Sequence, residues 1–267
     1  MNYVQDSSRI DHPVLVVGAG PAGLTAALEL TRHGQAVRII EQRQAQTTHF
    51  KALSINTRTL ELLEPVGVTE RLLAEGSPIP AVLYRTLTTE LFRIDYTKLE
   101  HRYNFMLALP QTDTERIMES RLAELGVQVE RGKTLVSFEQ TPAKVTAQVE
   151  HESSNDVIEA SYLIGADGAN SIVREISGIS FPGSVMQHQW SLADVRMQSP
   201  WPVEPANILL RKEGMLFALR IKDDLFRLGS NRPNVLENLP RGIIIQEKLW
   251  QTQFEVSHRQ VSSCQSG

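Results

Sequence analysis

The chain has 267 residues, enough to bury one large core or two, and its 41% hydrophobic and 22% charged residues are typical of a globular protein. A net charge of -4 gives no electrostatic basis for binding nucleic acid or an anionic membrane. The single cysteine, Cys264, excludes an intrachain disulfide and a multi-cysteine metal site.

No targeting or membrane segment is predicted. The start, MNYVQDSSRIDHP, lacks the basic region and apolar run of a signal peptide. No apolar run approaches the roughly 20 residues of a membrane span. These features predict a cytoplasmic protein.

A strand–helix–strand unit is predicted at the start of the chain. Residues 12–20, HPVLVVGAG, form an apolar run that ends in glycines, as in a strand buried on both faces. Residues 21–34 are rich in helix formers and end at Gly34, a favourable C-cap, and residues 35–43 are predicted to form a second buried strand. The unit has the length of about thirty residues that a parallel crossover needs.

Short helices and strands are predicted over the middle of the chain. The helix at 112–126 is expected to start at Thr112 as N-cap, with Glu115 completing a capping box. The other predicted elements are two short helices over 54–76 separated near Pro65 and Gly67, strands over 79–110 and 127–168, and a short helix over 169–178.

From about residue 179 the pattern is that of an antiparallel sheet. Gly214, Asp223 and Asp224 stand where tight turns are expected, and residues 235–254 are predicted to be mostly helical. The predicted domains are therefore an α/β domain over 1–178 and a mainly β domain over 179–267, with the strands of 79–110 packing against the second domain.

The spacing GxGxxG occurs at the turn between the first strand and the first helix. Glycines in this context allow a tight turn, a close approach of the backbone to a pyrophosphate, and close helix–strand packing. The start of the helix adds free N–H groups and a partial positive charge. The candidate phosphate-binding residues are Gly18, Gly20, Pro21, Ala22 and Gly23.

Glu41 ends the second predicted strand, 18 positions after the last glycine, Gly23, which fits the position of the acidic residue that binds an adenosine ribose. The alternative is a solvated charge at the end of a strand. An acidic residue here disfavours a 2′-phosphate and hence NADP, and leaves NAD and FAD open.

The segment SYLIGADGANSIVR (161–174) is predicted to be a buried strand that ends in Gly-Ala-Asp-Gly before a helix. It resembles the FAD-dependent aromatic hydroxylases, the para-hydroxybenzoate hydroxylase-like family, which carry the pattern GADGxxSxVR. Ser171 and Arg174 match that pattern in order. Three more stretches resemble the same family: KALSINTRTLELLEPVGVTERLLAEG, LPQTDTERIMESRLAELGVQVERG and SGISFPG. The resemblance covers nearly all of residues 12–267 and implies FAD as the cofactor.

The resemblance also implies cofactor contacts beyond the glycine loop. It places Asp167 near the pyrophosphate, although an N-cap role for the next helix is equally compatible with the residue. It places Gln111 near the ribityl–phosphate region, the alternative being a loop amide that satisfies backbone groups. Lys51 stands where the family usually has arginine, and both Lys51 and Arg43 are alternatively surface charges. The implied contacts are Glu41, Gln42, Arg43, Lys51, Gln111, Leu135, Asp167 and Gly168.

The resemblance implies an α/β fold (α+β overall), a Rossmann-like FAD-binding domain with a parallel sheet plus a mainly antiparallel β substrate domain. It implies hydroxylation of an aromatic, phenolic or polyketide-like substrate with NAD(P)H and O2. The flavin carries that chemistry, and no catalytic triad, nucleophile elbow or metal-ligand spacing is present, so catalytic residues stay unassigned and no metal is expected. Candidate lining residues, each more often a core residue, are Tyr84, Tyr96, Phe105, Trp190, Met215 and Phe217.

Two alternatives stay open. One is another oxidoreductase of the same flavin superfamily, such as a reductase or a halogenase, although the halogenase motif WxWxIP is not seen. The other is a truncated, catalytically impaired FAD-binding fragment. The stretch FEVSHRQVSSCQSG (254–267) resembles the segment before a third family motif, Gly-Asp-Ala-Ala-His, and the sequence contains no Gly-Asp pair. The resemblance therefore predicts a chain cut before that motif, with weak FAD binding and little activity.

Overall fold

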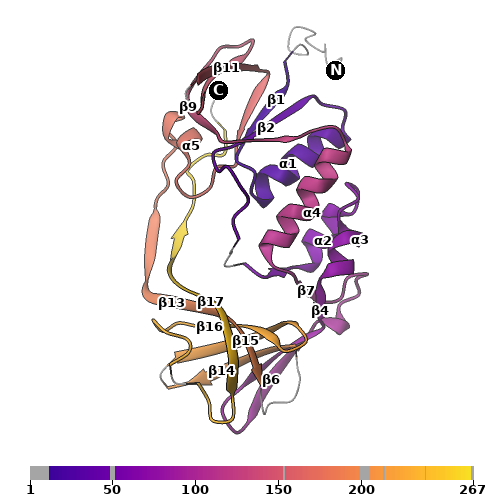
Figure 1. Ribbon diagram of the computed structural model, residues 1–267, viewed down its shortest axis with the longest axis vertical. Helices are drawn as coiled ribbons and strands as arrows, with labels where there is room; N and C mark the ends of the chain where they lie inside the picture. Colours follow the sequence, from indigo (N-terminus) through magenta and orange to yellow (C-terminus); the bar gives the residue numbers. More distant parts are fainter. Residues whose placement is uncertain are drawn as a thin grey trace.

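The computed structural model describes residues 12–48, 52–152, 154–198, 205–212, 214–237 and 239–265, without the side chains of 186–188. The described chain forms two lobes, shown in Figure 1. One lobe holds a parallel sheet with helices on one face, and the other holds a large, mostly antiparallel sheet. This arrangement confirms the predicted α/β class with a mainly antiparallel second part.

The parallel sheet has the strand order β12-β1-β2-β8, and every neighbouring pair in it is parallel. The helix α1 (Pro21–Arg32) connects β1 to β2, which confirms the predicted strand–helix–strand unit. Because parallel strands end at the same edge of a sheet, the residues that follow β1, β2 and β12 meet there. The strands are β1 (Val14–Val17), β2 (Val37–Glu41), β8 (Val129–Arg131) and β12 (Tyr162–Gly165).

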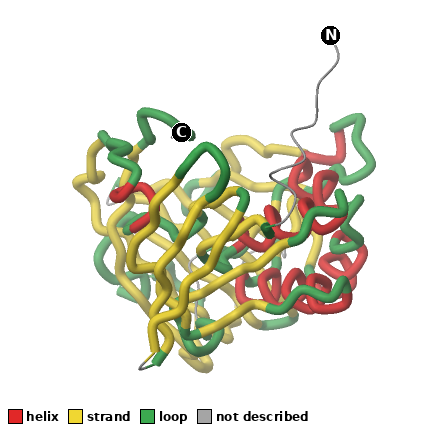
Figure 2. Tube along the Cα trace, turned by 90° about the horizontal axis from the view of Figure 1, so that it is seen from above, coloured by secondary structure: helices red, strands yellow, loops and turns green. Residues whose placement is uncertain are grey.

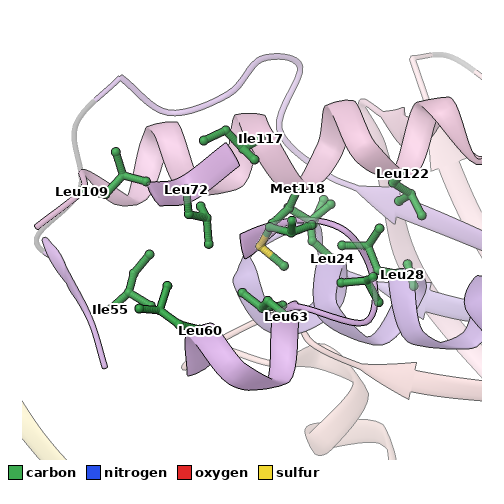
Figure 3. Close-up of a cluster of buried hydrophobic side chains, with 14 of the residues drawn as sticks. Leu24, Leu28, Ile55, Leu60, Leu63, Leu72, Leu109, Ile117, Met118 and Leu122 are labelled. Carbon is green, nitrogen blue, oxygen red and sulfur yellow. The ribbon is translucent and has the colours of Figure 1, made fainter. Parts of the chain in front are cut away.

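Helices cover one face of this sheet and bury the largest apolar cluster (Figure 3). Leu24 and Leu28 of α1 pack with Met118 and Leu122 of α4 and with Leu63 of α2. The apolar side chains repeat at helical spacing on each helix, so each helix has one buried face. The helices are α2 (Thr57–Leu63), α3 (Thr69–Glu75) and α4 (Gln111–Glu124), and α2 and α3 confirm the two predicted short helices.

A three-stranded antiparallel sheet covers the opposite face of the parallel sheet. Its order is β11-β10-β9, and its apolar side packs against Leu15, Val17 and Ile40. The short helix α5 (Ile172–Ile176) follows β12 and contacts β9. The strands are β9 (Lys133–Gln140), β10 (Val145–His151) and β11 (Ser154–Ala160).

The second lobe is a seven-stranded sheet with the order β17-β13-β16-β15-β14-β5-β6. All neighbouring pairs are antiparallel except β14 and β5. Figure 2 shows most helices gathered on one side of the molecule and most strands on the other. Its strands are β5 (Ala81–Arg85), β6 (Glu90–Asp95), β13 (Gly183–Gln198), β14 (Ala206–Arg211), β15 (Gly214–Lys222), β16 (Leu225–Ser230) and β17 (Ile244–Arg259).

A small sheet of order β3-β7-β4 joins the two lobes. Its strands are β3 (Ser54–Ile55), β4 (Ser77–Ile79) and β7 (Met106–Ala108). Ile79 and Ala108 pack with Ala206 of β14, so this sheet lies against one face of the seven-stranded sheet. The region 79–110 is thus divided: β5 and β6 extend the large sheet, whereas β7 pairs with β3 and β4. The boundary at residues 178 and 179 stays a prediction.

The helix predicted over 235–254 is wrong. Residues Ile244–Arg259 form β17, which pairs antiparallel with β13 along most of its length. Gln, Glu and Lys in this segment are good helix formers, but pairing with a distant strand outweighs so weak a local preference. The turns were predicted more accurately, since Asp223 and Gly214 both have positive φ, 47° and 138°, between paired strands.

The predicted capping box at Thr112 is also wrong. The helix α4 begins one residue earlier, at Gln111, after Pro110, and no side chain caps it. Proline has a fixed φ and no backbone N–H, so it suits the position just before a helix. The helix therefore begins directly after Pro110, earlier in the sequence than predicted. Glu115 is consequently free for another contact, described below.

The packing of α4 against α1 supports a first prediction. Leu122→Ala removes a fully buried side chain, and we expect the free energy of unfolding to fall by about 2–5 kcal/mol. Leu125→Ala, at a residue that is 36% exposed just after the same helix, should change it by only about 0.5 kcal/mol. Urea unfolding followed by circular dichroism measures both. Equal losses for the two variants would contradict the assigned packing.

Candidate dinucleotide-binding site

The glycine loop lies between the end of β1 and the start of α1. Gly18 has φ of +100°, a conformation that L side chains rarely adopt, and its N–H donates to the carbonyl of Ile40 at 2.8 Å. Gly20 is the N-cap residue of α1, Pro21 opens the helix, and no side chain caps it. Ala22 is exposed on the first turn. No side chain therefore occupies the N–H groups at the start of α1. An anion-binding site needs such free N–H groups.

Glycine is needed at positions 18, 20 and 23 for different structural reasons. A Cβ at Gly23 would lie 1.9 Å from the carbonyl oxygen of Gly18, and one at Gly18 would lie 2.4 Å from the carbonyl oxygen of Ala166. Both glycines are thus required by contacts within the protein. A Cβ at Gly20 meets only Glu115 Oε1, at 4.0 Å. Packing within the protein does not require glycine at position 20. A bound pyrophosphate would require it, because the backbone must approach the phosphates closely there.

Glu41 lies at the end of β2 and is 4% exposed. Its Oε2 accepts a hydrogen bond from the N–H of Ala19, in the glycine loop, at 3.0 Å. Its Oε1 accepts from the backbone N–H of Arg43 at 3.0 Å and from Arg43 Nε at 2.9 Å. Burial opposes ionisation, but these hydrogen bonds outweigh it, and the pKa of Glu41 lies below its ordinary value. Glu41 is therefore an ionised acceptor fixed beside the loop.

The Gly-Ala-Asp-Gly turn after β12 packs directly on the glycine loop. The N–H of Ala166 donates to the carbonyl of Val17 at 2.8 Å, and Ala166 lies next to both Gly18 and Gly23. The two motifs, distant in the sequence, thus lie at one edge of the sheet. Gly168 has φ of +85° and open space around it.

Asp167 supports the start of α5. Its Oδ1 accepts from Ser171 Oγ at 2.5 Å, and its Oδ2 accepts from the N–H of Val173 at 3.2 Å. Ser171 is the N-cap of α5 and accepts from the N–H of Arg174 at 3.0 Å. The N-cap of α5 is thus Ser171 and not Asp167, which instead binds the Ser171 hydroxyl and a backbone N–H of the first turn. Arg174 pairs within the structure, donating to the carbonyl of Ala169 at 2.8 Å.

Gln111 and Glu115 form a pair on the first turn of α4. Gln111 Nε2 donates to Glu115 Oε1 at 2.8 Å, and Glu115 is only 2% exposed. Burial raises the pKa of Glu115 above its ordinary value, against the hydrogen bond from Gln111 and the charge of Arg43. Since Glu115 Oε1 is the neighbour of Gly20, sequence reasoning assigned Glu115 the wrong role. The i,i+4 spacing from Gln111 was the signal that could have revealed the pair.

The structure brings most of the predicted contacts to one place, but not all. Gln42 is exposed at the end of β2. Leu135 lies on β9 in the apolar cluster with Leu15 and Ile40, on the face of the sheet opposite α1. Lys51 lies outside the described residues. The cofactor roles of these residues stay predictions.

The loop after Glu41 contributes one residue that the sequence did not suggest. Gln46 Nε2 is buried, and no hydrogen-bond partner for it is present among the described residues. A buried donor without a partner costs free energy that a bound acceptor can recover. The open helix N-terminus at Gly20 and the acceptor Glu41 fit a ligand with phosphate and ribose groups. The residues present therefore fit a dinucleotide.

A separate pocket of about 1100 Å³ lies beside β12. It is lined by Asp167, Gly168 and Arg174 but by none of the glycine-loop residues. None of the six predicted lining residues, such as Trp190 or Phe217, contributes to it. The described ranges contain no cluster of three potential metal ligands. Among the described helices, none is both long and apolar enough to cross a membrane.

A strand, glycine loop and helix followed by an acidic residue at the end of the second strand define a dinucleotide-binding protein of the α/β class. More specifically, the chain belongs to the family described as FAD binding domain, whose model matches residues 11–256. This confirms the resemblance to FAD-dependent monooxygenases and hydroxylases, and FAD as the cofactor of the family.

Relatives of the chain are monooxygenases. It is 31% identical to 6-methylpretetramide 4-monooxygenase of Streptomyces rimosus over 273 residues, which covers 95% of this chain and 49% of that enzyme. Among solved structures, it matches OxyS anhydrotetracycline hydroxylase of Streptomyces rimosus with a TM-score of 0.73 at 28% identity, covering 94% of this chain and 54% of that one.

The fold is also that of p-nitrophenol 4-monooxygenase PnpA of Pseudomonas putida DLL-E4. The TM-score is 0.82 at 19% identity, and the match covers 94% of this chain and 69% of that one. The chain spans about half the length of the two Streptomyces rimosus relatives it matches.

The differing roles of the glycines give a second prediction. Gly20→Ala should fold as the wild type does but weaken FAD binding by about tenfold, about 1.4 kcal/mol, because the added methyl group occupies the ligand's approach. Gly23→Ala should instead lower the free energy of unfolding by about 1–3 kcal/mol, because α1 must move away from Gly18. Flavin fluorescence titration and thermal unfolding separate the two effects. Unchanged FAD affinity in Gly20→Ala would contradict the site.

The two buried carboxyl groups give a third prediction, through the pH dependence of stability. The raised pKa of Glu115 means that its stabilising contribution is complete below 4.5 and is lost as the pH rises through the folded pKa. Glu115→Gln keeps an oxygen that accepts from Gln111 and removes this loss. We therefore expect the stability of Glu115→Gln to gain on that of the wild type as the pH rises above 4.5.

Glu41→Gln is the control of opposite sign. The lowered pKa of Glu41 contributes stability above 4.5 that is lost only as the pH falls through the folded pKa. This variant should therefore be less stable than the wild type at neutral pH, with the difference shrinking in acid. Urea unfolding across a pH series measures both variants. Curves parallel to the wild type for both would refute the assignment.

Proposed function

We propose that the protein of which this chain forms the cofactor-binding and β-sheet parts hydroxylates an aromatic compound with NAD(P)H and O2. The observation that carries the proposal is the open N-terminus of α1 at Gly20, flanked by the ionised acceptor Glu41, in a chain of the FAD binding domain family. The monooxygenase names of relatives such as 6-methylpretetramide 4-monooxygenase support a hydroxylation reaction.

In this proposal the glycine loop and α1 hold the FAD pyrophosphate. The N–H groups of the first helical turn bind its oxygens, and Glu41 accepts from the adenosine ribose. Gln111, on the first turn of α4, is placed on the same side of the sheet and has its amide oriented by Glu115. Bound FAD supplies hydride uptake from NAD(P)H and activation of O2.

The substrate is proposed to lie against one face of the seven-stranded sheet. Residues opposite one another on paired strands share a face, and the register places Tyr84, Trp190, Met215 and Phe217 on the same one. The small sheet β3-β7-β4 packs on this face, which is thereby turned toward the other lobe. Phe105 instead packs in the helical cluster, and Tyr96 follows β6 in a short turn.

The aromatic character of this face suits an aromatic ring. Offset and edge-on ring contacts favour flat apolar ligands, and Tyr84 already stacks on Phe92 with ring centroids 4.4 Å apart. Overall, ArH, O2, NAD(P)H and a proton would give ArOH, NAD(P)+ and water. In this proposal the protein's part is to bind and orient the substrate and to exclude water, because the flavin carries the chemistry.

The fourth prediction tests the proposal directly. The purified protein, supplied with FAD, should oxidise NADH or NADPH several-fold faster when a phenolic or tetracycline-like compound is present. With 18O2, one labelled oxygen should appear in the aromatic product, as mass spectrometry would show. Gly20→Ala serves as the matched control, since it should fold but respond only at higher FAD concentration. FAD binding without stimulated oxidation would leave a flavin-binding role only and would contradict the hydroxylase proposal.

A further inference from the structure

We propose that Arg227 is a positioning residue for the cofactor site. From the middle of the seven-stranded sheet it holds the carbonyl of Ala52, and through that carbonyl it fixes the start of α4, where Gln111 lies. The proposal rests on the proposed function in that the positioned group is FAD. The contacts themselves are features of the chain alone.

Arg227 lies on β16 directly opposite Asp194 of β13. Its Nε and Nη2 donate to the two carboxylate oxygens of Asp194, each at 2.7 Å, and the residue is 4% exposed. The guanidinium also stands over the ring of Trp250, 5.4 Å from its centroid. These contacts orient the planar group, because a forked pair permits one arrangement only.

The same guanidinium reaches out of its sheet. Arg227 Nη1 donates to the carbonyl oxygen of Ala52 at 3.3 Å, although Ala52 lies 175 residues away in the sequence. Ala52 belongs to the connection between Glu41, at the end of β2, and β3. A side chain of the large sheet thus binds the backbone that leads away from the candidate ribose acceptor.

The carbonyl of Ala52 is shared with α4. It also accepts from the N–H of Gln111 at 3.3 Å, and the N–H of Leu109 donates to the carbonyl of Leu53 at 2.8 Å. These two bonds extend the pairing of β3 with β7 to the first residue of the helix. The side chain of Gln111 then continues to Glu115, beside Gly20. Hydrogen bonds thus link Asp194 through Arg227, Ala52 and Gln111 to Glu115, whose side chain lies next to Gly20.

The chemistry of the pair argues for positioning rather than for stability of the sheet alone. A buried ion pair contributes little net stability compared with apolar residues of similar volume, because both charges lose their hydration. The neighbour of Arg227 on β15 is Leu219, and the next in that row is Ala206, so apolar residues serve at this level of the sheet. An apolar residue at position 227 would pack, but it would not bind the carbonyl of Ala52.

Arg227→Lys tests the inference, and it is the fifth prediction. Lysine keeps the charge beside Asp194 but lacks the fork that reaches Asp194 and Ala52 together. In the cofactor-free protein we expect amide hydrogen exchange at Leu109 and Gln111 to become about tenfold faster, and we expect the Kd for FAD to rise about tenfold, as the loss of one charge-assisted hydrogen bond predicts. Exchange in β9–β11 should not change.

Arg196→Lys is the matched control. Arg196 lies on β13 of the same sheet and pairs with Asp224 at 2.6 Å and with Glu247 at 3.3 Å, but the side chains of Arg196 and Asp224 are about 45% exposed. This variant should leave exchange at Leu109 and Gln111 and the Kd for FAD at their wild-type values.

Two results would overturn the inference. One is wild-type exchange at Leu109 and Gln111 with a wild-type Kd for FAD in Arg227→Lys. The other is faster exchange spread evenly over the molecule, which indicates a structural role only. If Arg227→Lys does not fold, Asp194→Asn carries the same test with a smaller expected change, because it weakens the clamp that orients the guanidinium. Absence of FAD binding by the wild type would refute the proposed function, while exchange in the cofactor-free protein would still decide the role of Arg227.

Discussion

The close backbone contact between two loops is the constraint on which the site depends. Gly18 follows β1 and Ala166 follows β12, and these neighbouring parallel strands end at the same edge. There is no room for a side chain at Gly18 against Ala166, or at Gly23 against Gly18. The start of α1 is therefore held at one position and angle above the strand ends. Its unbound N–H groups are aimed before any ligand arrives, which reduces the ordering cost of binding an anion.

Two buried carboxyl groups flank this helix start, and their opposite pKa shifts follow from their partners. Glu41 accepts hydrogen bonds from Ala19 and Arg43, which lower its pKa and keep it ionised. Glu115 accepts one hydrogen bond, from the amide of Gln111, and its burial outweighs that bond and raises its pKa. A second full negative charge next to Gly20 would repel a pyrophosphate. Arg43 compensates the charge of Glu41, and burial disfavours the charged form of Glu115, so neither group offsets the positive end of α1 as strongly as a free carboxylate would.

Features coded by neighbouring residues could be predicted from the sequence, and features that depend on distant strands could not. The first strand–helix–strand unit and the turns at Gly214 and Asp223 are local, since spacing and backbone preference decide them. β17 was mistaken for a helix because its partner β13 lies far away in the sequence. The burial of Glu115 depends on the packing of α4 over the glycine loop, so its spacing alone suggested a cap. Nothing near Arg227 in the sequence points to Ala52.

The relative placement of the two lobes follows from how often the chain passes between them. The chain enters the seven-stranded sheet at β5 and β6 and returns through β7 and α4 to the parallel sheet. It then enters the seven-stranded sheet a second time along β13 (Figure 1). Each passage is tied by the β3-β7-β4 sheet or by the long pairing of β13 with β17. Independent domains on one linker would rotate freely. Here several crossings of the chain hold the aromatic face and the glycine loop relative to each other. An aromatic ligand on one lobe and a flavin on the other would therefore meet in a geometry set by the backbone. Arg227 adds a side-chain link between the lobes through its hydrogen bond to Ala52.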